Sequence, residues 1–557
     1  MSSHRCVLFL VCVFSVFSFA LPAEAQRKLP CTTAEVSTQH GPVCGLQLQS
    51  KGTAEREGAA VIAHLGIPFA EPPTGANRWL PPQPLDPWQQ TYHATQFAPA
   101  CPQWNQGGSS IIGQEDCLYL NVWAPQNAQN LPVMVWIYGG AFVEGGAFYP
   151  LFDGTNLASV GNVVVVDFNY RLGVLGFLAA GSPINVNGNY GFLDQQAALT
   201  WVKNNIASFG GDPTKVTIFG ESAGAMSTGL HLLSAPASKS LFRAGVMQSN
   251  PLALSYQTLA NAQTSGSQFI QQKLNNCSTL SCLQGLTMEQ VLNAQGPSAG
   301  MTAGSLTWGP VIDQRVITAA PLASFGSLNK PLLLGTNHDE GTFFVDSDPQ
   351  IPNPLLGWEY TQYVIPQLFP NNTAAVLQKY PAASGDNRPL LSQLLTDYLF
   401  TCPNRYAAEN TPAAQKAYAY QFNEVSGFAW PLPGCADYVC HGAELPYVFS
   451  TANSIHACGD NGTSTCKFTI GELLLSVAMI DYWSSFAANL QPKGSVSWPV
   501  YNQYLLLNTF ADNPLIKPSG PDPFKDTCCF WENLNFYGPP SPACSSGSKK
   551  EGKKGKS

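Results

Sequence analysis

Residues 215–224 are Lys-Val-Thr-Ile-Phe-Gly-Glu-Ser-Ala-Gly, a β-rich run that leads into a helix-compatible segment. The last five have the G-x-S-x-G pattern of a nucleophile elbow, in which a strand turns sharply into a helix and exposes a serine hydroxyl. Gly220 and Gly224 leave room for the strand and the helix to approach closely. The helix N-terminus then lies where it can stabilise an oxyanion. Because a bare G-x-S-x-G also occurs in plain turns, the surrounding sequence has to decide.

The segments on either side of this elbow predict alternating strands and helices. Continuous apolar runs of strand length occur at 133–138, 163–168, 244–247 and 331–334. Between them, 190–209 has the apolar spacing of a helix. Buried strands separated by helices predict a large, mostly parallel central sheet covered by helices on both faces, which is an α/β fold. Residues 345–430 are richer in proline and aromatic residues, and we expect a helical insertion beside the sheet.

The N-terminal segment 1–25 has the features of a secretion signal peptide. A short polar start precedes a 16-residue apolar stretch, and Ala23-Glu24-Ala25 forms an A-x-A cleavage pattern. A membrane anchor is the alternative, but a spanning helix needs ~20 residues. No later apolar run is long enough to span a bilayer. We therefore expect a secreted, extracellular protein without a stable membrane anchor.

Cysteine usage agrees with an exported chain. Removal of the signal leaves 14 of the 16 cysteines, an even number that indicates disulfides rather than metal ligands. No C-x-x-C pair is followed by histidines at zinc spacing, and we expect neither a metal nor a cofactor. Three N-x-S/T sequons predict N-glycosylation, at Asn276, Asn371 and Asn461.

The charge of the chain is unevenly distributed. Residues 545–557 contain five lysines and one glutamate, so subtracting their +4 from the net charge of −8 leaves −12 for the rest. An acidic body argues against nucleic acid as a partner. The lysine-rich tail is low in complexity and is predicted to be disordered. No long linker or internal repeat divides the remainder, so 26–544 is predicted to be a single domain.

A serine nucleophile needs a base to accept its proton and a carboxylate to orient that base. In α/β-hydrolases these follow the serine in the order acid, then histidine. Four histidines follow Ser222 in this chain: His231, His338, His441 and His456. The first is expected to face away on the helix after the elbow, and the last stands in a cysteine-flanked polar loop. The 338–340 loop and His441, which follow strand ends, are the stronger candidates.

Several ordered motifs accompany the elbow. They are Gly-Ile-Pro-Phe-Ala-Glu-Pro-Pro at 66–73, Glu-Asp-Cys-Leu-Tyr-Leu-Asn-Val at 115–122, Asn-Tyr-Arg-Leu-Gly at 169–173, Phe-Gly-Gly-Asp-Pro at 209–213, Gln-Ser at 248–249, Asp-Glu-Gly at 339–341 and His-Gly-Ala-Glu at 441–444. Over roughly residues 30–540 the chain thereby resembles the type-B carboxylesterases, the family of cholinesterases, carboxylesterases and lipases. The resemblance implies the α/β-hydrolase fold and a serine hydrolase that cleaves small-molecule carboxylic esters.

The resemblance also implies the roles of individual residues. Ser222 matches the nucleophile, His441 the general base and Glu340 the orienting acid. Asp339 is the rival for the acid, but the family places the acid directly before the glycine. The backbone donors of the oxyanion hole match Gly140, Ala141 and Ala223, although the family often has a glycine in place of Ala141. Each such donor contributes about 10²–10³ in rate.

Disulfide pairs follow from the same resemblance. Cys101–Cys117 and Cys277–Cys282 match two loop-closing pairs of the family, and Cys402–Cys528 matches a third. Cys31–Cys44 is a plausible N-terminal pair. The partners of the remaining cysteines stay open: Cys435, Cys440, Cys458, Cys466, Cys529 and Cys544.

Differences between this sequence and the family pattern narrow the range of expected substrates. Cholinesterases have a tryptophan at the position of Gly107, where it stacks on a quaternary ammonium group, and Trp104 is displaced from that position. Only 15 residues separate Cys101 from Cys117, too few for the long lid of the fungal lipases. We therefore expect an esterase for soluble or short-acyl esters. The alternatives are an interfacial lipase or sterol esterase and a non-catalytic adhesion protein on the same fold. The oligomeric state and the physiological ester stay open.

Overall fold

The fold is described from a computed structural model. It covers residues 29–545, except 50–57, 106, 298–300, 303–304, 429–431, 433, 456–465, 502 and 511–512. The predicted signal peptide, His456, Cys458, Asn461 and all but the first residue of the lysine-rich tail lie outside the described residues. No helix in the described part of the chain is both long and apolar enough to cross a membrane.

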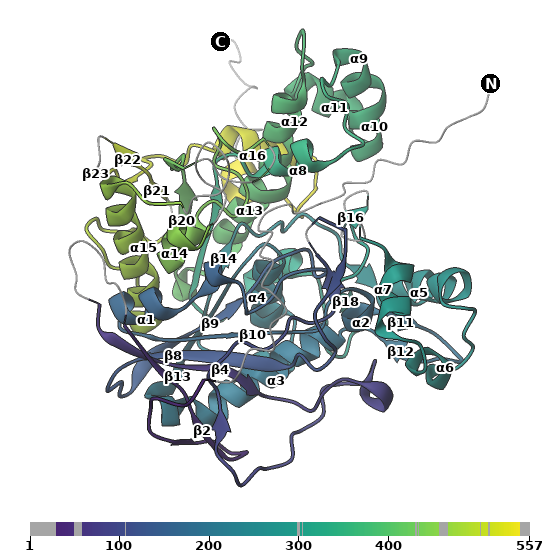
Figure 1. The fold of residues 1–557 in the computed structure, drawn as a ribbon. Helices are drawn as coiled ribbons and strands as arrows, with labels where there is room; N and C mark the ends of the chain where they lie inside the picture. Colours follow the sequence, from purple (N-terminus) through teal and green to yellow (C-terminus); the bar gives the residue numbers. More distant parts are fainter. Residues whose placement is uncertain are drawn as a thin grey trace, which may run out of the picture.

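An 11-stranded mixed sheet forms the centre of the molecule (Figure 1). In spatial order the strands are β24 (Lys517–Pro518), β21 (Tyr504–Leu507), β20 (Ala417–Phe422), β19 (Leu332–Asn337), β14 (Ala244–Gln248), β13 (Gly211–Glu221), β9 (Leu131–Ile137), β10 (Val164–Phe168), β8 (Tyr119–Pro125), β4 (Ala60–Pro68) and β3 (Leu46–Gln49). The central strands, from β21 to β10 in spatial order, run parallel to one another. Antiparallel pairs occur at both edges. The predicted mostly parallel sheet is therefore confirmed.

Helices cover both faces of this sheet, because side chains of a strand alternate between faces and those of the central strands are mostly apolar on both. Ile218 of β13 is in register with Gly245 of β14, and a Cβ at Gly245 would lie 2.8 Å from Leu232 of helix α4 (Ala223–Leu233). The next residue, Phe219, faces the other way and stacks on Phe449 of α14 (Leu445–Phe449). Other helices that flank the sheet are α1 (Thr155–Gly161), α3 (Tyr190–Asn205) and α15 (Ile470–Asn489).

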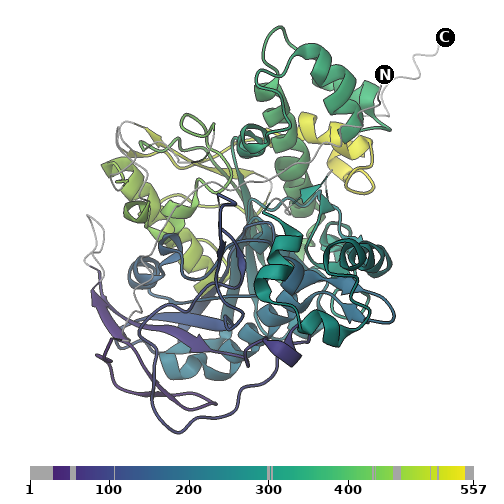
Figure 2. The same ribbon diagram turned by 45° about the vertical axis from the view of Figure 1, so that its right-hand side comes forward.

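A group of helices projects beyond one end of the sheet (Figures 1 and 2). It consists of α8 (Glu340–Ser347), α9 (Gly357–Glu359), α10 (Ile365–Leu368), α11 (Thr373–Lys379), α12 (Arg388–Leu395) and α13 (Cys402–Asn410), with π-helical turns at Tyr360–Val364 and Thr396–Thr401. Helix α16 (Lys525–Asn533) near the C-terminus, yellow in both views, packs beside α13 and is joined to it by the Cys402–Cys528 disulfide.

Two local expectations differ from the structure. The helical insertion expected over 345–430 is helical only to residue 410, and 417–422 forms strand β20 inside the sheet. Its aromatic side chains had suggested an insertion, but they pack between the sheet and its covering helices. The helix expected over 190–209 ends at Asn205 and continues to Phe209 as a tighter 3₁₀ turn. Gly210 follows with a φ of 82°, which an ordinary helical residue cannot adopt.

Candidate active site

Ser222 occupies a sharp turn between β13 and α4. Its backbone has a φ of 53° and a ψ of −121°, a conformation that a non-glycine residue adopts only under strain. Hydrogen bonds hold the turn on both sides: the Ser222 N–H donates to the Gln248 carbonyl at 3.0 Å, and the Met226 N–H donates to the Ser222 carbonyl at 2.8 Å. The predicted strand–turn–helix context of the serine is therefore present.

The two glycines of the elbow are required by close backbone contacts. A Cβ at Gly224 would lie 1.8 Å from the Ile137 carbonyl oxygen, and a Cβ at Gly220 would lie 2.5 Å from the backbone of Gly224. Both distances are far below van der Waals contact. Any larger residue would push the helix away from strands β9 and β13, and would move Ser222 with it.

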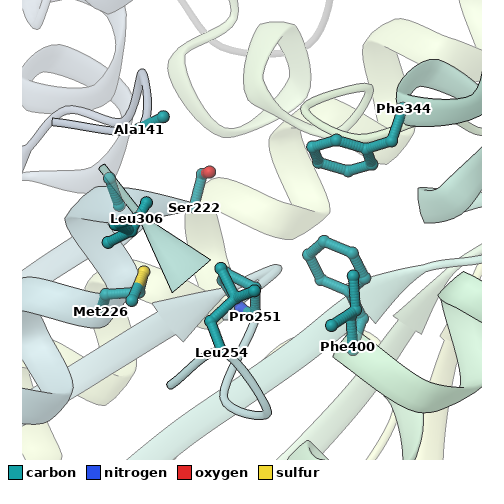
Figure 3. Close-up of a pocket in the computed structure, with 10 residues that line it drawn as sticks. Ala141, Ser222, Met226, Pro251, Leu254, Leu306, Phe344 and Phe400 are labelled. Carbon is teal, nitrogen blue, oxygen red and sulfur yellow. The ribbon is translucent and has the colours of Figure 1, made fainter. Parts of the chain in front are cut away.

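The loop after β9 supplies backbone N–H groups opposite the serine. Gly140, Ala141 and Phe142 have successive positive φ values of 105°, 50° and 62°. Ala141 lines the pocket next to Ser222 (Figure 3). Among the described residues, no backbone acceptor engages the amides of Gly140, Ala141 or Ala223. The last of these is the first residue of α4, where the amide has no partner inside the helix.

His441 is completely enclosed by carboxylates and aromatic rings. Its Nδ1 lies 2.6 Å from Glu340 Oε2, and the buried Glu340 is the first residue of α8. The backbone N–H of Asn337 donates to the other oxygen of Glu340 at 2.8 Å. Phe344 and Phe400 pack against the imidazole with ring centroids 5.0 and 5.1 Å away. The acid and the histidine expected from the sequence are thus in direct contact.

A second carboxylate, which the sequence analysis did not single out, faces the other side of the ring. Glu221 Oε1 lies 3.0 Å from His441 Nε2. In the described part of the chain, Nε2 forms no well-oriented hydrogen bond, either with Glu221 or with Ser222. The elbow motif itself could have pointed to Glu221. This residue directly precedes the nucleophile and is the last residue of β13, beside the loop that carries Gly139. A Cβ at Gly139 would lie 2.7 Å from Glu221 Oε2.

Burial and charge act in opposite directions on His441. Burial alone would lower the pKa of the imidazole, because it penalises the charged form. The carboxylates Glu221 and Glu340 outweigh this effect and raise the pKa of His441 above its ordinary value of 6.5. The protonated ring is therefore favoured at neutral pH until proton transfer or substrate binding changes its surroundings.

A buried polar network supports the histidine from behind. Glu444 accepts hydrogen bonds from Gln248 Nε2 at 3.0 Å and from Asn337 Nδ2 at 2.7 Å. Asn337 also donates to the Cys440 carbonyl at 2.8 Å, directly before His441. Burial, followed by the charges of Glu221 and Glu340, raises the pKa of Glu444 to about 7. Glu444 is the last residue of the His-Gly-Ala-Glu motif at 441–444. Its contact with Asn337 could not be predicted from that motif, because the contact depends on tertiary structure.

Two of the remaining candidate residues lie away from this centre. His231 is buried on α4, where its ring nitrogens bond to Ser238 Oγ at 2.8 Å and Gln195 Oε1 at 3.0 Å. Burial lowers the pKa of His231 to about 3, so the ring is neutral. His338 is half-exposed and pairs with Asp339 at 2.8 Å. Asp339 is therefore occupied by a neighbour other than His441.

The pocket beside Ser222 is small and apolar. It is lined by hydrophobic side chains from six parts of the chain: Ala141, Met226, Pro251, Leu254, Leu306, Phe344, Leu399 and Phe400. Figure 3 shows Met226, Pro251, Leu254, Leu306, Phe344 and Phe400 around Ser222. Its volume is about 20 Å³. A single water needs ~10–15 Å³ on the same kind of measure, so only a small group fits without rearrangement.

The Cys101–Cys117 loop forms a short hairpin rather than a flap. Strands β6 (Gln103–Trp104) and β7 (Ile111–Ile112) pair antiparallel inside it. The Trp104 indole donates to the Leu292 carbonyl at 3.0 Å, which ties the loop to α7 (Met288–Gln295). Trp104 is thus engaged in holding the loop.

Six disulfides occur among the described residues. Four join the pairs named from the sequence: Cys31–Cys44, Cys101–Cys117, Cys277–Cys282 and Cys402–Cys528. Two others, Cys435–Cys440 and Cys529–Cys544, join cysteines whose partners the sequence left open. The first of these closes the loop directly before His441. Two of the three sequon asparagines, Asn276 and Asn371, are exposed.

Comparisons with known proteins agree with this geometry. The model of the "Carboxylesterase family" matches residues 32–516. The cAMP-regulated D2 protein of Dictyostelium discoideum is 37% identical over 78% of this chain and 82% of its own length. An acetylcholinesterase of Bungarus fasciatus is 34% identical over 90% of this chain and 86% of its own. Among solved structures, a thermophilic PNB esterase covers 89% of this chain and 99% of its own, at 32% identity and a TM-score of 0.73. The fold is that of the α/β-hydrolases.

Proposed function

Because this chain belongs to the carboxylesterase family and is a carboxylic ester hydrolase, we propose that it cleaves soluble or short-acyl esters through an acyl-enzyme on Ser222. The observation that carries this proposal is the strained elbow of Ser222 beside the His441–Glu340 pair. In that pair, His441 Nδ1 lies 2.6 Å from Glu340 Oε2. We assign the nucleophile to Ser222, the general base to His441 and the orienting acid to Glu340.

In the first half-reaction, Ser222 Oγ attacks the ester carbonyl while its proton passes to His441 Nε2. Nε2 must be neutral and must exchange its contact with Glu221 for one with Oγ. The negative charge on the carbonyl oxygen is stabilised by the amides of Gly140, Ala141 and Ala223, which have no competing backbone acceptor among the described residues. His441 then protonates the leaving alcohol. Water attacks the acyl-enzyme by the same route and releases the acid.

Glu340 holds the imidazole in one orientation. Its Oε2 accepts from Nδ1, so the other ring nitrogen is left to face the serine. Asn337 fixes Glu340 through its backbone and the His441 loop through its side chain. This double contact supports a fixed distance between the acid and the base through the catalytic cycle.

The shape of the site supports a short acyl group. A pocket of about 20 Å³, closed by Leu306, Phe344 and Phe400, has no room for a long acyl chain unless these side chains move. The Cys101–Cys117 hairpin is too short to open as a lid on an oil surface. Trp104 is tied to α7 and cannot stack on a choline group there. These features favour an esterase over an interfacial lipase or a cholinesterase.

The signal-like segment 1–25 and the disulfides support a secreted enzyme. Exposed Asn276 and Asn371 are accessible for N-glycosylation. A mass measurement of the secreted chain, before and after enzymatic removal of glycans, tests both points. A mature N-terminus other than Gln26 would contradict the cleavage site.

A panel of p-nitrophenyl esters of increasing acyl length tests the substrate proposal. We expect kcat/KM to be highest for short acyl groups and to fall as the chain grows. Each substrate is measured below and above its solubility limit. A sharp rise in rate at that limit indicates interfacial activation and contradicts the proposal in favour of a lipase. Absence of hydrolysis across the panel favours an adhesion protein.

A further inference from the structure

A second cavity lies between helices α8 and α12, the neighbouring helices of the projecting group (Figure 1). Its volume is about 400 Å³, within the ~300–1,000 Å³ typical of small-molecule sites. Thr342 and Asp346, four residues apart on α8, face this cavity, whereas Phe344 between them faces the Ser222 pocket. The helix therefore separates two cavities of different chemistry.

The charged groups of this cavity are already paired inside the protein. Arg388 donates to Asp346 at 3.1 Å and to Asp386 at 2.7 Å. Asp339 pairs with His338 through one oxygen, and its other oxygen accepts from the Val439 N–H at 3.0 Å. A ligand with a net charge would have to compete with these contacts. The cavity thus favours a neutral ligand.

Polar groups without a partner line the same walls. The hydroxyls of Thr342, Ser392 and Tyr438 form no hydrogen bond with another described residue. Hydroxyl groups both donate and accept, whereas a carboxylate oxygen only accepts. The partner that satisfies all of them at once is a molecule with several hydroxyl groups. The half-exposed ring of Tyr438 adds a flat face for the C–H side of such a molecule.

We propose that the cavity between α8 and α12 is a second binding site, which takes a neutral polyhydroxylated ligand the size of a monosaccharide. The site is distinct from the Ser222 pocket, whose lining is apolar. Its walls include Asp339, directly before Glu340, and Tyr438, within the Cys435–Cys440 loop that ends before His441. A ligand held there contacts both segments that carry the acid and the base.

The test measures binding of methyl β-D-glucopyranoside to the Ser222→Ala protein by titration with saturation-transfer NMR. The serine variant removes turnover, so the result does not depend on the proposed ester hydrolysis. Cyclohexylmethanol, which has a similar ring and one hydroxyl, serves as the probe for purely apolar binding. We expect saturable binding of the glucoside with a Kd in the millimolar range and no saturable binding of cyclohexylmethanol at this site.

Two tryptophan substitutions localise the site. Gln393→Trp places an indole at an exposed wall residue and should weaken glucoside binding at least tenfold. Gln378→Trp makes the same change at an exposed position of α11, outside the cavity, and should leave binding unchanged. Thr342→Val and Ser392→Ala each remove one hydroxyl at nearly constant shape and should each weaken binding several-fold.

Three results would overturn the proposal. The first is an absence of saturable glucoside binding up to about 100 mM, a range that covers the millimolar affinities of weak sites. The second is equal binding by the Gln393→Trp and Gln378→Trp proteins, with both folded as judged by circular dichroism. The third is equal or stronger binding of cyclohexylmethanol, because hydroxyl groups would then contribute nothing.

Discussion

Replacement of Glu221 by glutamine tests how the two carboxylates around His441 set the pH dependence of the enzyme. The general base must be neutral to accept the serine proton, so kcat/KM rises with pH through the pKa of His441. Glu221 and Glu340 together raise that pKa above 6.5. The acid limb of the wild-type profile should therefore lie above pH 6.5. Glu221→Gln removes one of the two charges and keeps the shape of the side chain.

The size of the effect follows from the 3.0 Å between Glu221 Oε1 and His441 Nε2. Two unit charges at this distance attract by about 5.5 kcal/mol at an effective dielectric constant of ~20, before the cost of burying them is subtracted. Opposite charges in such contact shift a pKa by about 1–3 units, at 1.36 kcal/mol per unit. Glu221→Gln should move the acid limb to lower pH by about 1–3 units. The plateau at high pH should fall, because the imidazolium formed during the reaction loses one stabilising charge.

The measurement is kcat/KM for p-nitrophenyl acetate between pH 5 and 10, in buffers of constant ionic strength. Glu289→Gln is the matched control, because it makes the same change at an exposed residue of α7. Its profile should coincide with that of the wild type. An acid limb that stays in place in Glu221→Gln, or moves to higher pH, would refute the electrostatic account of His441.

Three further predictions concern the remaining parts of the site. Glu340→Gln should reduce kcat by about 10⁴-fold while the protein stays folded, since the imidazole loses its orienting partner. Steady-state kinetics on aryl esters measure the loss and circular dichroism checks the fold; a loss of kcat below tenfold contradicts the prediction. Gly224→Ala should destabilise the fold by about 1–3 kcal/mol, because its Cβ would lie 1.8 Å from the Ile137 carbonyl, and urea unfolding measures the change. Leu306→Ala should widen the pocket at Ser222 and raise the kcat/KM ratio of hexanoate to acetate esters about tenfold or more; an unchanged ratio means that the acyl group binds elsewhere.

The sequence was sufficient to predict the features that local patterns encode. The elbow around Ser222 lies in one continuous segment, and the buried strands beside it are apolar runs that predict a parallel sheet. The contact between Glu340 and His441 was expected from motif order and the resemblance. In the structure the two residues follow neighbouring strands of the sheet, β19 and β20. These ends meet at one edge of a parallel sheet.

The remaining features depend on tertiary packing. The place of Glu221 against Nε2 of His441 requires the exact path of the loop between β20 and His441, which no periodicity describes. Strand β20 was assigned to an insertion, since its aromatic residues do not alternate with polar ones and both of its faces are buried. The Cys435–Cys440 and Cys529–Cys544 pairs could not be chosen from spacing, because six cysteines allow 15 pairings.

The most direct test of the central claim is covalent labelling of Ser222. The purified protein is treated with a fluorophosphonate probe, digested and mapped by mass spectrometry, in parallel with the Ser222→Ala and Ser227→Ala variants. Ser227 is a second serine, buried on α4 and bonded to Gln195 Nε2, so it controls for the loss of any serine in this helix. We predict one labelled peptide, with the probe on Ser222, in the wild type and in Ser227→Ala, and none in Ser222→Ala. Label that persists in folded Ser222→Ala, or a wild-type protein that takes none, would contradict the account.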